Sequence, residues 1–220
     1  MLNIIENKIL KIHSSFGRIR KMEEKKIFQN CIDLLANIYA NEDSAEGKNT
    51  ANFLLGADCS SINFTENQNS KSYSKIFNSY SSKEEHPLVQ EVRKISHLLP
   101  WYQSDCEGRL DEELKKQMIM TELVGPNSII HSSQYELGIY FQFPNVSYYS
   151  RRHPAEETFF TLSGKSFWKI EEKEEVERFV GDYIHHPSMA SHSNRTSDEH
   201  LIACWRWSGD ISLEGYKNFK

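Results

Sequence analysis

The second half of the chain is divided into short runs of β-branched and aromatic residues, separated by turn-forming residues. From about Met118, runs such as ELVGPNSIIHSSQYELGIYFQFPN and HLIACWRW are cut by Gly-Pro, Ser-Ser and Pro-Asn steps. Short strands at this spacing, with turns between them, are typical of antiparallel sandwiches and barrels. No unit repeats at a fixed period, which argues against a solenoid or a propeller. The sequence therefore predicts a small β-barrel in this half.

The first hundred residues have a different pattern, in which apolar residues recur at helical spacing. Ile27, Cys31 and Ile38 lie on one face of an expected helix. We expect a turn region over 41–52, an irregular connector over 57–86, and a further helix that starts at Ser82 and stops near residue 100.

The expected architecture is mainly β with α. A helical N-terminal region, residues 1–100, packs on a small β-barrel formed by residues 101–220. The chain has 220 residues, of which 38% are hydrophobic. That is enough apolar material for a folded core and argues against global disorder.

Charge and cysteine usage limit the functional classes. The net charge is −5, and Lys and Arg are dispersed among Glu rather than gathered in a stripe, so a nucleic-acid partner is not expected. The four cysteines form no CxxC pair, which favours a reducing cytoplasm over a disulfide scaffold. No apolar run approaches the roughly 20 residues needed to cross a membrane, and the first residues do not resemble a signal peptide.

Two segments of the second half carry metal-ligand residue types. The first runs from Arg151 to Gly164 and contains His153 and Glu157, and the second runs from Gly181 to His192. A lone histidine is more often a packing or surface residue than a ligand. Together, however, the segments match the spacing of the two cupin motifs, with His153, Glu157 and Gly164 in the first and Gly181, Pro187 and His192 in the second.

The spacing has a physical reason. Alternate residues of a strand point to the same face, so a histidine and a glutamate from one hairpin can meet a histidine from another inside the barrel. We therefore expect one divalent transition metal ion (Zn, Fe, Mn, Co or Ni) on His153, Glu157 and His192. Of His185 and His186, only one can face inward, and a supporting role is expected for it rather than ligation.

Several segments resemble the cupin-type dimethylsulfoniopropionate lyases. They are LLPWYQS, GPNSII, LGIYFQFPN, YYSRRHPAEETFFTLSG, GDYIHHPS and CWRWSGDIS, and they cover roughly residues 97–213. The HPAEE and GD-x4-PS-x3-H blocks are common to cupins in general. Their combination with GPN, the P-x3-YY lead-in and W-x-W-x-GD is more specific.

The resemblance implies a metal-dependent β-elimination that converts a small carboxylated sulfonium substrate into dimethyl sulfide and acrylate. In such a reaction the metal holds the carboxylate, a tyrosine removes the α-proton, and aromatic faces accommodate the sulfonium. Tyr148 matches a pocket tyrosine of the family and is the expected base, and Trp207 matches an aromatic pocket wall. A homodimer is common among cupins, and the resemblance leaves that assembly open.

Two positions depart from the family pattern. The first metal-binding histidine is replaced by Arg151, and the tyrosine two residues after the glutamate is replaced by Phe159. Arginine stays protonated and cannot ligate, and phenylalanine cannot move a proton. Arg151 is then expected either to bind a substrate carboxylate, with Phe159 and Trp207 beside it, or to form a structural ion pair with Glu156 or another acid.

These departures keep three functional classes open. The leading one is a carbon–sulfur lyase or a close relative that acts on a small carboxylated substrate. The second is a different metal-dependent cupin, such as an oxygenase or an isomerase, because two histidines and a carboxylate resemble the Fe(II) facial triad. The third is a non-catalytic cupin that binds a small ligand.

Overall fold

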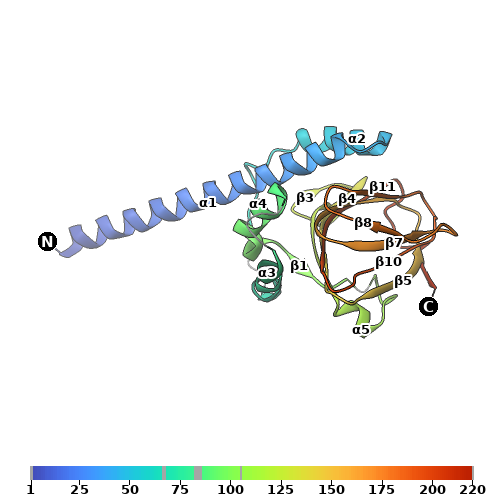
Figure 1. The fold of residues 1–220 in the computed structure, drawn as a ribbon. Helices are drawn as coiled ribbons and strands as arrows, with labels where there is room; N and C mark the ends of the chain where they lie inside the picture. Colours follow the sequence, from blue (N-terminus) through green and yellow to red (C-terminus); the bar gives the residue numbers. More distant parts are fainter. Residues whose placement is uncertain (1, 66–67, 82–85, 105, 220) are drawn as a thin grey trace.

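The computed structural model describes the backbone of residues 2–65, 68–81, 86–104 and 106–219, and the side chains of this set other than 2–16 and 68. Helices occupy the first part and strands the second (Figure 1). The helices are α1 (Leu2–Ala40), α2 (Ala45–Leu55), α3 (Gln68–Tyr80), α4 (Pro87–Ile95), a 3-10 turn (Ser96–Leu98) and α5 (Glu112–Lys115). The strands are β1 (Trp101–Tyr102), β2 (Met118–Gly125), β3 (Ile130–His131), β4 (Tyr135–Gln142), β5 (Ser147–Arg152), β6 (Glu156–Gly164), β7 (Ser166–Ile170), β8 (Val176–Arg178), β9 (Tyr183–His186), β10 (His192–Arg195), β11 (Leu201–Ser208) and β12 (Lys217–Phe219).

The region from 41 to 52 is largely helical, so the prediction of a turn there was wrong. Ser44 caps α2 and accepts a hydrogen bond from the backbone N–H of Gly47 at 2.8 Å. A serine cap with Glu46 in the first turn is a strong helix start. The cap therefore favours a helix here, although the polar composition of the segment suggested a turn.

The expected connector over 57–86 is also partly helical, because it contains α3. Its inner face combines large apolar residues with serines. Phe77 is fully buried and packs against Trp101, with ring centroids 4.9 Å apart. Ser74 hydrogen-bonds Ser96 at 2.7 Å, and Ser70 donates to the carbonyl of Leu99 at 2.6 Å. Small hydroxyls bonded in this way are buried without leaving unpaired polar groups.

The next helix, α4, begins at Pro87, and the predicted start at Ser82 lies outside the described residues. His86 Nδ1 accepts a hydrogen bond from the N–H of Leu88 at 3.2 Å, and proline at the first helical position suits a fixed φ. Leu88, Val92 and Ile95 are buried at helical spacing on the inner face of α4.

Two sheets, antiparallel except for the parallel pair of β2 and β3, face each other and form the walls of the barrel. The larger has the order β1-β2-β4-β11-β6-β9, with β3 beside β2, and the smaller has the order β12-β5-β10-β7-β8. Among the described strands the two sheets do not join into a closed cylinder. Apart from this open seam, the predicted fold class is confirmed.

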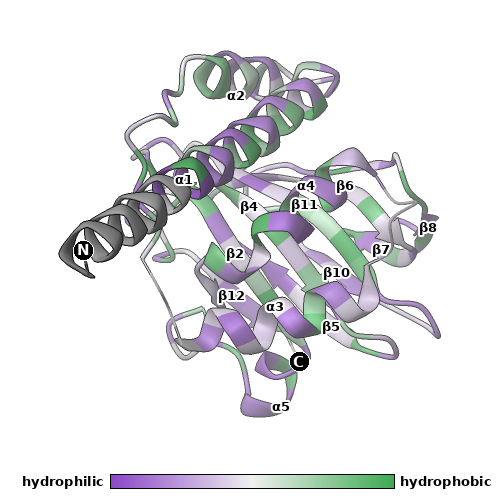
Figure 2. Ribbon diagram, turned by 90° about the vertical axis from the view of Figure 1, so that its left-hand side faces the viewer, coloured by the Kyte–Doolittle hydropathy of each residue, from purple (hydrophilic) through white to green (hydrophobic). Residues whose placement is uncertain are grey.

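Alternation along the strands separates two cores. Outward-facing residues of the larger sheet, such as Phe141, Leu162 and Ile202, share one hydrophobic core with buried residues of α1, α2, α3 and α4. Inward-facing aromatic residues, such as Phe159 and Trp205, form a second cluster between the sheets. Figure 2 shows α1 and α2 lying across the larger sheet. The helices therefore form the outer layer and leave the interior of the barrel to a different set of side chains.

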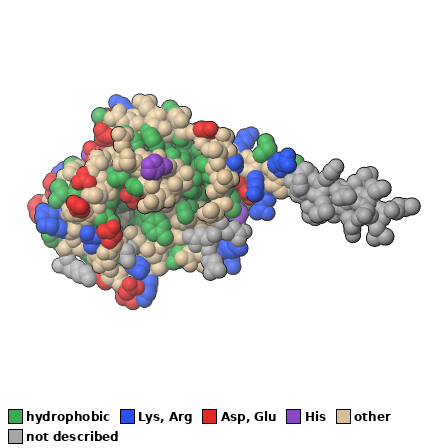
Figure 3. All heavy atoms as spheres, turned by 180° about the vertical axis from the view of Figure 1, so that it is seen from behind, with side chains coloured by type: hydrophobic (Ala, Val, Ile, Leu, Met, Phe, Trp, Pro, Cys, Tyr) green, Lys and Arg blue, Asp and Glu red, His purple; other side chains and the backbone are tan. Residues whose placement is uncertain are grey.

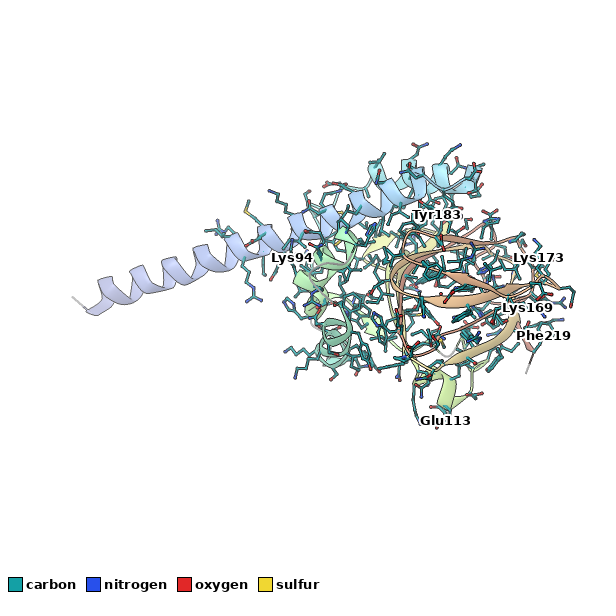
Figure 4. All side chains as sticks on the ribbon, in the orientation of Figure 1. Lys94, Glu113, Lys169, Lys173, Tyr183 and Phe219 are labelled. Atoms are coloured by element: carbon teal, nitrogen blue, oxygen red, sulfur yellow. The ribbon has the colours of Figure 1, made fainter. Side chains whose placement is uncertain are left out.

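Tyr183 ties the barrel to α1, and it lies where these two parts meet (Figure 4). Its hydroxyl donates to the carbonyl of Ile38 at 2.6 Å. The division of the chain into a helical region and a barrel at residue 100 stays a prediction. In the described part of the chain, no helix combines the length and apolar character needed to cross a membrane.

Candidate metal centre and pocket

A cavity of about 80 Å³ lies inside the barrel. Its walls combine aromatic rings with a few charged groups, and side chains of both sheets fill the space around it (Figure 4). Among the lining residues are Glu136, Tyr140, Tyr148, Arg151, Glu157 and Trp207. A small apolar chamber with a few convergent polar groups is the usual form of a small-molecule site.

Glu157 is the centre of a buried cluster at one wall of this cavity. Its Oε2 atom lies 3.3 Å from Nε2 of His153, 3.2 Å from Nε2 of His192 and 3.1 Å from Nδ1 of His186. Its other oxygen accepts a hydrogen bond from the indole N–H of Trp207 at 2.6 Å. Each of the three rings is at most 2% exposed, so the cluster is shielded from water.

The two predicted histidine ligands are held in one tautomer. Nδ1 of His153 lies 3.0 Å from the carbonyl oxygen of Ala155, and Nδ1 of His192 lies 3.0 Å from that of Ala190. A carbonyl can only accept a hydrogen bond, so both Nδ1 atoms carry protons. In a neutral ring, Nε2 is then an acceptor.

Three acceptors therefore converge, because both Nε2 atoms face the Glu157 carboxylate. The ligand atoms of His153, Glu157 and His192 lie within 4.8 Å of one another. Nε2 of His192 has no hydrogen-bond partner of good geometry. Either an extra proton on a ring or a cation must lie between these atoms, and this donor set fits a divalent transition metal.

His186 has a different role from the two facing rings. Its Nδ1 atom donates to Glu157, and its ring stacks on His192 with centroids 4.1 Å apart. It orients the carboxylate, as partners just outside a metal's ligands commonly do. His185, its neighbour, points to the opposite side of the sheet, in agreement with the expectation that only one of the pair faces inward.

The electrostatics of the cluster follow from its burial. Burial alone would raise the pKa of Glu157, but His153 and the hydrogen bonds from the three histidines outweigh it and hold that pKa well below its usual range. Burial, together with His186 and Arg151, holds the pKa of His192 well below its usual range. Burial also lowers the pKa of His186. The ionised form of Glu157 and the neutral form of His192 are the protonation states that metal binding requires.

A second group of metal-ligand residue types lies on the outer face of the same sheet. It consists of Glu42, Glu156 and His185. Here Nη2 of Arg206 lies 2.8 Å from Glu42 and 3.4 Å from Glu156, and Thr158 donates to Glu42 at 2.8 Å. The guanidinium already supplies the positive charge, so this outer cluster is an ion-pair network between the α1–α2 corner and the barrel.

Arg151 is buried in the pocket and does not pair with Glu156, which lies on the outer face. Its Nη1 atom donates to Asn194 at 3.2 Å, and its guanidinium carbon lies 3.8 Å from the ring centroid of Tyr148. This geometry is a cation–π contact in a site largely shielded from water. Of the two expectations, the position inside the pocket suits the carboxylate-binding role.

Tyr148 also lines the pocket, and its hydroxyl lies 2.6 Å from the hydroxyl of Tyr216. Burial and the neighbouring Tyr216 and Cys106 raise the pKa of Tyr148 well above its usual range, and Arg151 acts in the opposite direction. Sequence reasoning missed Tyr216, because it lies in an irregular stretch between β11 and β12. The fold brings it to the cavity wall, where its ring also lies 5.9 Å from that of His153 between centroids.

Phe159 and Trp207 form apolar walls of the same cavity. The Phe159 ring packs against Trp168 at 4.8 Å and against Tyr140 at 5.5 Å. Trp207 lies against His153, with ring centroids 4.4 Å apart. Of the seven site residues predicted from the sequence, five line the cavity, and His153 and His192 adjoin it through their contacts with Glu157.

The fold and the inward-facing imidazole–carboxylate cluster define a cupin. The sequence profile of the dimethylsulfoniopropionate lyase family matches residues 71–203, more than half of the chain. The chain therefore belongs to the dimethylsulfoniopropionate lyase family.

Individual relatives give the scale of the similarity. The chain is 34% identical over 74 residues to the dimethylsulfoniopropionate lyase DddQ of Ruegeria pomeroyi; the matched stretch covers 34% of this chain and 33%, about a third, of the relative. The crystal structure of DddQ from that organism superposes with a TM-score of 0.67 at 20% identity, over 88% of this chain and 96% of that one. A chain from the crystal structures of the lyases RdDddP and RnDddQII superposes with a TM-score of 0.61 at 14% identity, over 87% and 100%. The structural likenesses support the fold.

Proposed function

We propose that the protein is a metal-dependent carbon–sulfur lyase, which cleaves dimethylsulfoniopropionate or a close relative into a sulfide and an α,β-unsaturated acid. The observation that carries this proposal is the convergence of two acceptor nitrogens on the Glu157 carboxylate, at the wall of a pocket that also contains Arg151. Membership of the lyase family supports the reaction type.

In this proposal His153, Glu157 and His192 hold one divalent ion, for which Zn, Fe, Mn, Co and Ni are the candidates. When bound, such an ion supplies Lewis acidity that stabilises negative charge on a substrate carboxylate. Trp207 and His186 fix the orientation of Glu157 through their N–H groups. The site is therefore preorganised by residues that are not ligands themselves.

Arg151 binds and orients the substrate carboxylate. Its guanidinium is held in place by Asn194 and the face of Tyr148, so little side-chain freedom is lost on binding. A charge-assisted, bidentate contact also withdraws charge from the carboxylate and acidifies the adjacent C–H group. Phe159 and Trp207 exclude water around the alkyl part of the substrate.

Tyr148 is the proposed base. Its phenolate takes the α-proton, the C–H electron pair forms the new C=C bond, and the C–S bond breaks with its electron pair leaving on the neutral sulfide. Burial opposes the phenolate, whereas the cationic Arg151 favours it, as would a bound divalent ion. The hydroxyl of Tyr216, 2.6 Å away, provides a route for the proton to leave.

A second candidate activity is an Fe(II)-dependent oxidation or isomerisation of a small carboxylated compound. The specific observation in its favour is the set of two histidines and one carboxylate, which leaves positions open on a bound ion. A family tyrosine replaced by Phe159 also removes one proton-transfer group. Oxygen uptake by the Fe(II)-loaded protein, without sulfide release, would favour this candidate.

The surroundings of the site agree with a small-molecule enzyme. Acidic and basic side chains are interspersed on the face shown in Figure 3, with no basic stripe that would suggest nucleic acid. The cysteines of the described chain are free thiols. We propose a reducing cytoplasm as the location, no nucleic-acid or membrane partner, and a homodimer as one assembly to test.

Headspace detection of dimethyl sulfide from the metal-loaded protein and dimethylsulfoniopropionate tests the proposal directly. Sulfide release that depends on metal and falls by about 10²-fold or more in Tyr148→Phe is the expected result. Tyr149→Phe, on the neighbouring residue, is the matched control and should leave the rate unchanged. Absence of sulfide from every metal form would overturn the lyase proposal.

A further inference from the structure

Arg151 is a buried cation, and in the described part of the chain its hydrogen-bond partner is a neutral amide. The side chain is 3% exposed, and Nη1 donates to Oδ1 of Asn194 at 3.2 Å. Asn194 on β10 lies opposite Tyr148 on β5, and the ring of Tyr148 packs against the guanidinium. One cross-strand pair therefore supplies both contacts that hold the cation, and neither contact is a carboxylate.

The orientation of the Asn194 amide is set by hydrogen bonds that cross to the larger sheet. Nε2 of Gln142 on β4 lies 3.0 Å from the carbonyl oxygen of Val146. A carbonyl can only accept, so this contact places the nitrogen of Gln142 there and turns its side-chain oxygen to the other side. That oxygen lies 2.5 Å from Nδ2 of Asn194, which donates to it. The oxygen of Asn194 is thereby left to face Arg151.

Both amides of this chain are enclosed and paired. Gln142 is fully buried, and its Oε1 atom also accepts a hydrogen bond from the hydroxyl of Tyr140 at 2.8 Å. A buried amide whose donors and acceptors are all opposed by the right partners cannot turn end for end without losing them. The two amides therefore present a fixed acceptor to Arg151 that carries no negative charge.

The two acids of the cavity wall do not bond to Arg151 either. Glu157 shares its charge with three histidines and an indole N–H. Burial, followed by the charge and the hydrogen bond of Glu122, raises the pKa of Glu136 to about 9, so Glu136 is protonated near neutral pH. Because Arg151 itself lines the cavity, its charge is available to an anion that enters there.

We propose that Asn194 is a specificity-determining residue, which holds Arg151 in place without cancelling its charge, and that Gln142 is the positioning residue that keeps the oxygen of Asn194 turned toward the guanidinium. A carboxylate at position 194 would also fix the guanidinium but would occupy it as an ion pair. The neutral amide therefore keeps the site selective for an anionic ligand over a neutral ligand of the same shape. This inference rests on the proposed function only in placing the substrate carboxylate on Arg151.

Two unreactive probes, propionate and its neutral isostere propionamide, measure the charge that Arg151 offers to a ligand. Their dissociation constants are determined by calorimetry on the metal-loaded protein at low salt, and the metal content of every variant is determined in parallel. The wild type should bind propionate at least about tenfold more tightly than propionamide, because a charge-assisted contact is stronger than a neutral one. Arg151→Met should lose most of this preference.

Asn194→Asp and Asn194→Ala separate the charge of the partner from its hydrogen bond. The aspartate keeps the shape and the bond to Arg151 but cancels its charge, so the preference for propionate should fall at least about tenfold at unchanged metal content. The alanine removes the bond and leaves the charge, so the preference should remain. A role in folding alone predicts the reverse order. Asn52→Asp, on the exposed side of α2, is the matched control and should behave as the wild type does.

The role of Gln142 is tested with Gln142→Leu. This variant releases the Asn194 amide, whose nitrogen can then turn toward the guanidinium, and binding of propionate should weaken several-fold while binding of propionamide does not change. Gln142 can also turn its own amide toward an aspartate at position 194, because the Val146 carbonyl keeps the N–H of Thr196 at 2.9 Å. An equal loss for both probes in Gln142→Leu would overturn the positioning role.

The other outcomes are distinct. A preference that survives in Asn194→Asp, or that is lost in Asn194→Ala, would overturn the inference and leave the lyase proposal standing. If Asn194→Asp does not fold, Asn194→Ala decides alone by the same criterion. A full preference in Arg151→Met would place the carboxylate elsewhere and overturn this inference as well. An intact preference in a wild type that releases no sulfide would overturn the lyase proposal alone.

Discussion

Glu156 and Glu157 are neighbours on β6 and belong to two clusters that differ in kind. Glu157 faces inward, to three imidazoles and an indole N–H. Glu156 faces outward, to His185, Glu42 and the guanidinium of Arg206. Both clusters contain the residue types that bind metals, and β6 contributes one glutamate to each.

The difference lies in the source of positive charge. On the outer face a permanent cation, Arg206, is already bonded to Glu42 at 2.8 Å, so the carboxylates need no ion. On the inner face, backbone carbonyl groups fix the tautomers of His153 and His192. The unprotonated Nε2 atoms of both rings therefore face the Glu157 carboxylate, which is itself an acceptor. The residue types in a cluster do not by themselves distinguish a metal centre from an ion-pair network. The protonation state that the surrounding groups impose on the cluster distinguishes them.

Arg206→Met should have the largest effect, and it breaks the outer cluster alone. Glu42 is 3% exposed and would lose its cation, which in buried pairs costs about 3–5 kcal/mol of unfolding free energy. Chemical denaturation measures this loss. Metal content per folded molecule should not change, and a loss of metal would contradict the independence of the two clusters.

His186→Ala should weaken the inner cluster by an intermediate amount. The ring donates to Glu157 at 3.1 Å without being a proposed ligand, and partners of this kind are worth about 10–100-fold in metal affinity. Competition with a chromogenic chelator gives the affinity. An unchanged affinity would mean that His186 only fills space.

Restoring the family pattern with Arg151→His and Phe159→Tyr sharpens the account of the inner pocket. The variant regains a fourth ligand and a phenol, and we expect lyase activity to rise by at least about tenfold, or roughly 1.4 kcal/mol of barrier. The rate of sulfide release is the measurement. No gain would show that the pocket has diverged beyond these two positions.

His185→Ala should have the smallest effect and is the matched control for His186→Ala. His185 is 41% exposed on its side chain and lies 3.9 Å from Glu42, so its contribution to stability should stay below about 1 kcal/mol. Metal affinity should be that of the wild type. A metal loss as large as that of His186→Ala would contradict the assignment of the two neighbours to opposite faces.

Much of the inner cluster could be predicted because strand alternation fixes which residues converge. His153, Glu157 and His192 follow from parity and two motifs, whereas Tyr148, Trp207 and the departures at Arg151 and Phe159 come from the resemblance to the lyase family. Glu136 and Tyr216 could not be found in this way, because one lies on a distant strand and the other in irregular chain. Their proximity is a property of sheet register and of the closing segment after β11.

The helical half was harder to predict. The buried face of α3 contains Phe77 together with serines that find partners only in the folded protein, such as Ser74 with Ser96, and hydrophobic periodicity does not detect these serines. The start of α2 was readable from Ser44 and Glu46, but the polar composition around them suggested a turn. Local capping signals were the better guide in this segment.

Metal content by inductively coupled plasma mass spectrometry is the most direct test of the central claim, with Glu157→Gln and Glu156→Gln as matched neighbours. The account predicts about one divalent ion per chain in the wild type and in Glu156→Gln after reconstitution. It predicts a large loss in Glu157→Gln, whose amide cannot supply the negative ligand. A wild type that binds no ion, or a Glu157→Gln variant that retains it, would contradict the assignment of the inner cluster as a metal centre.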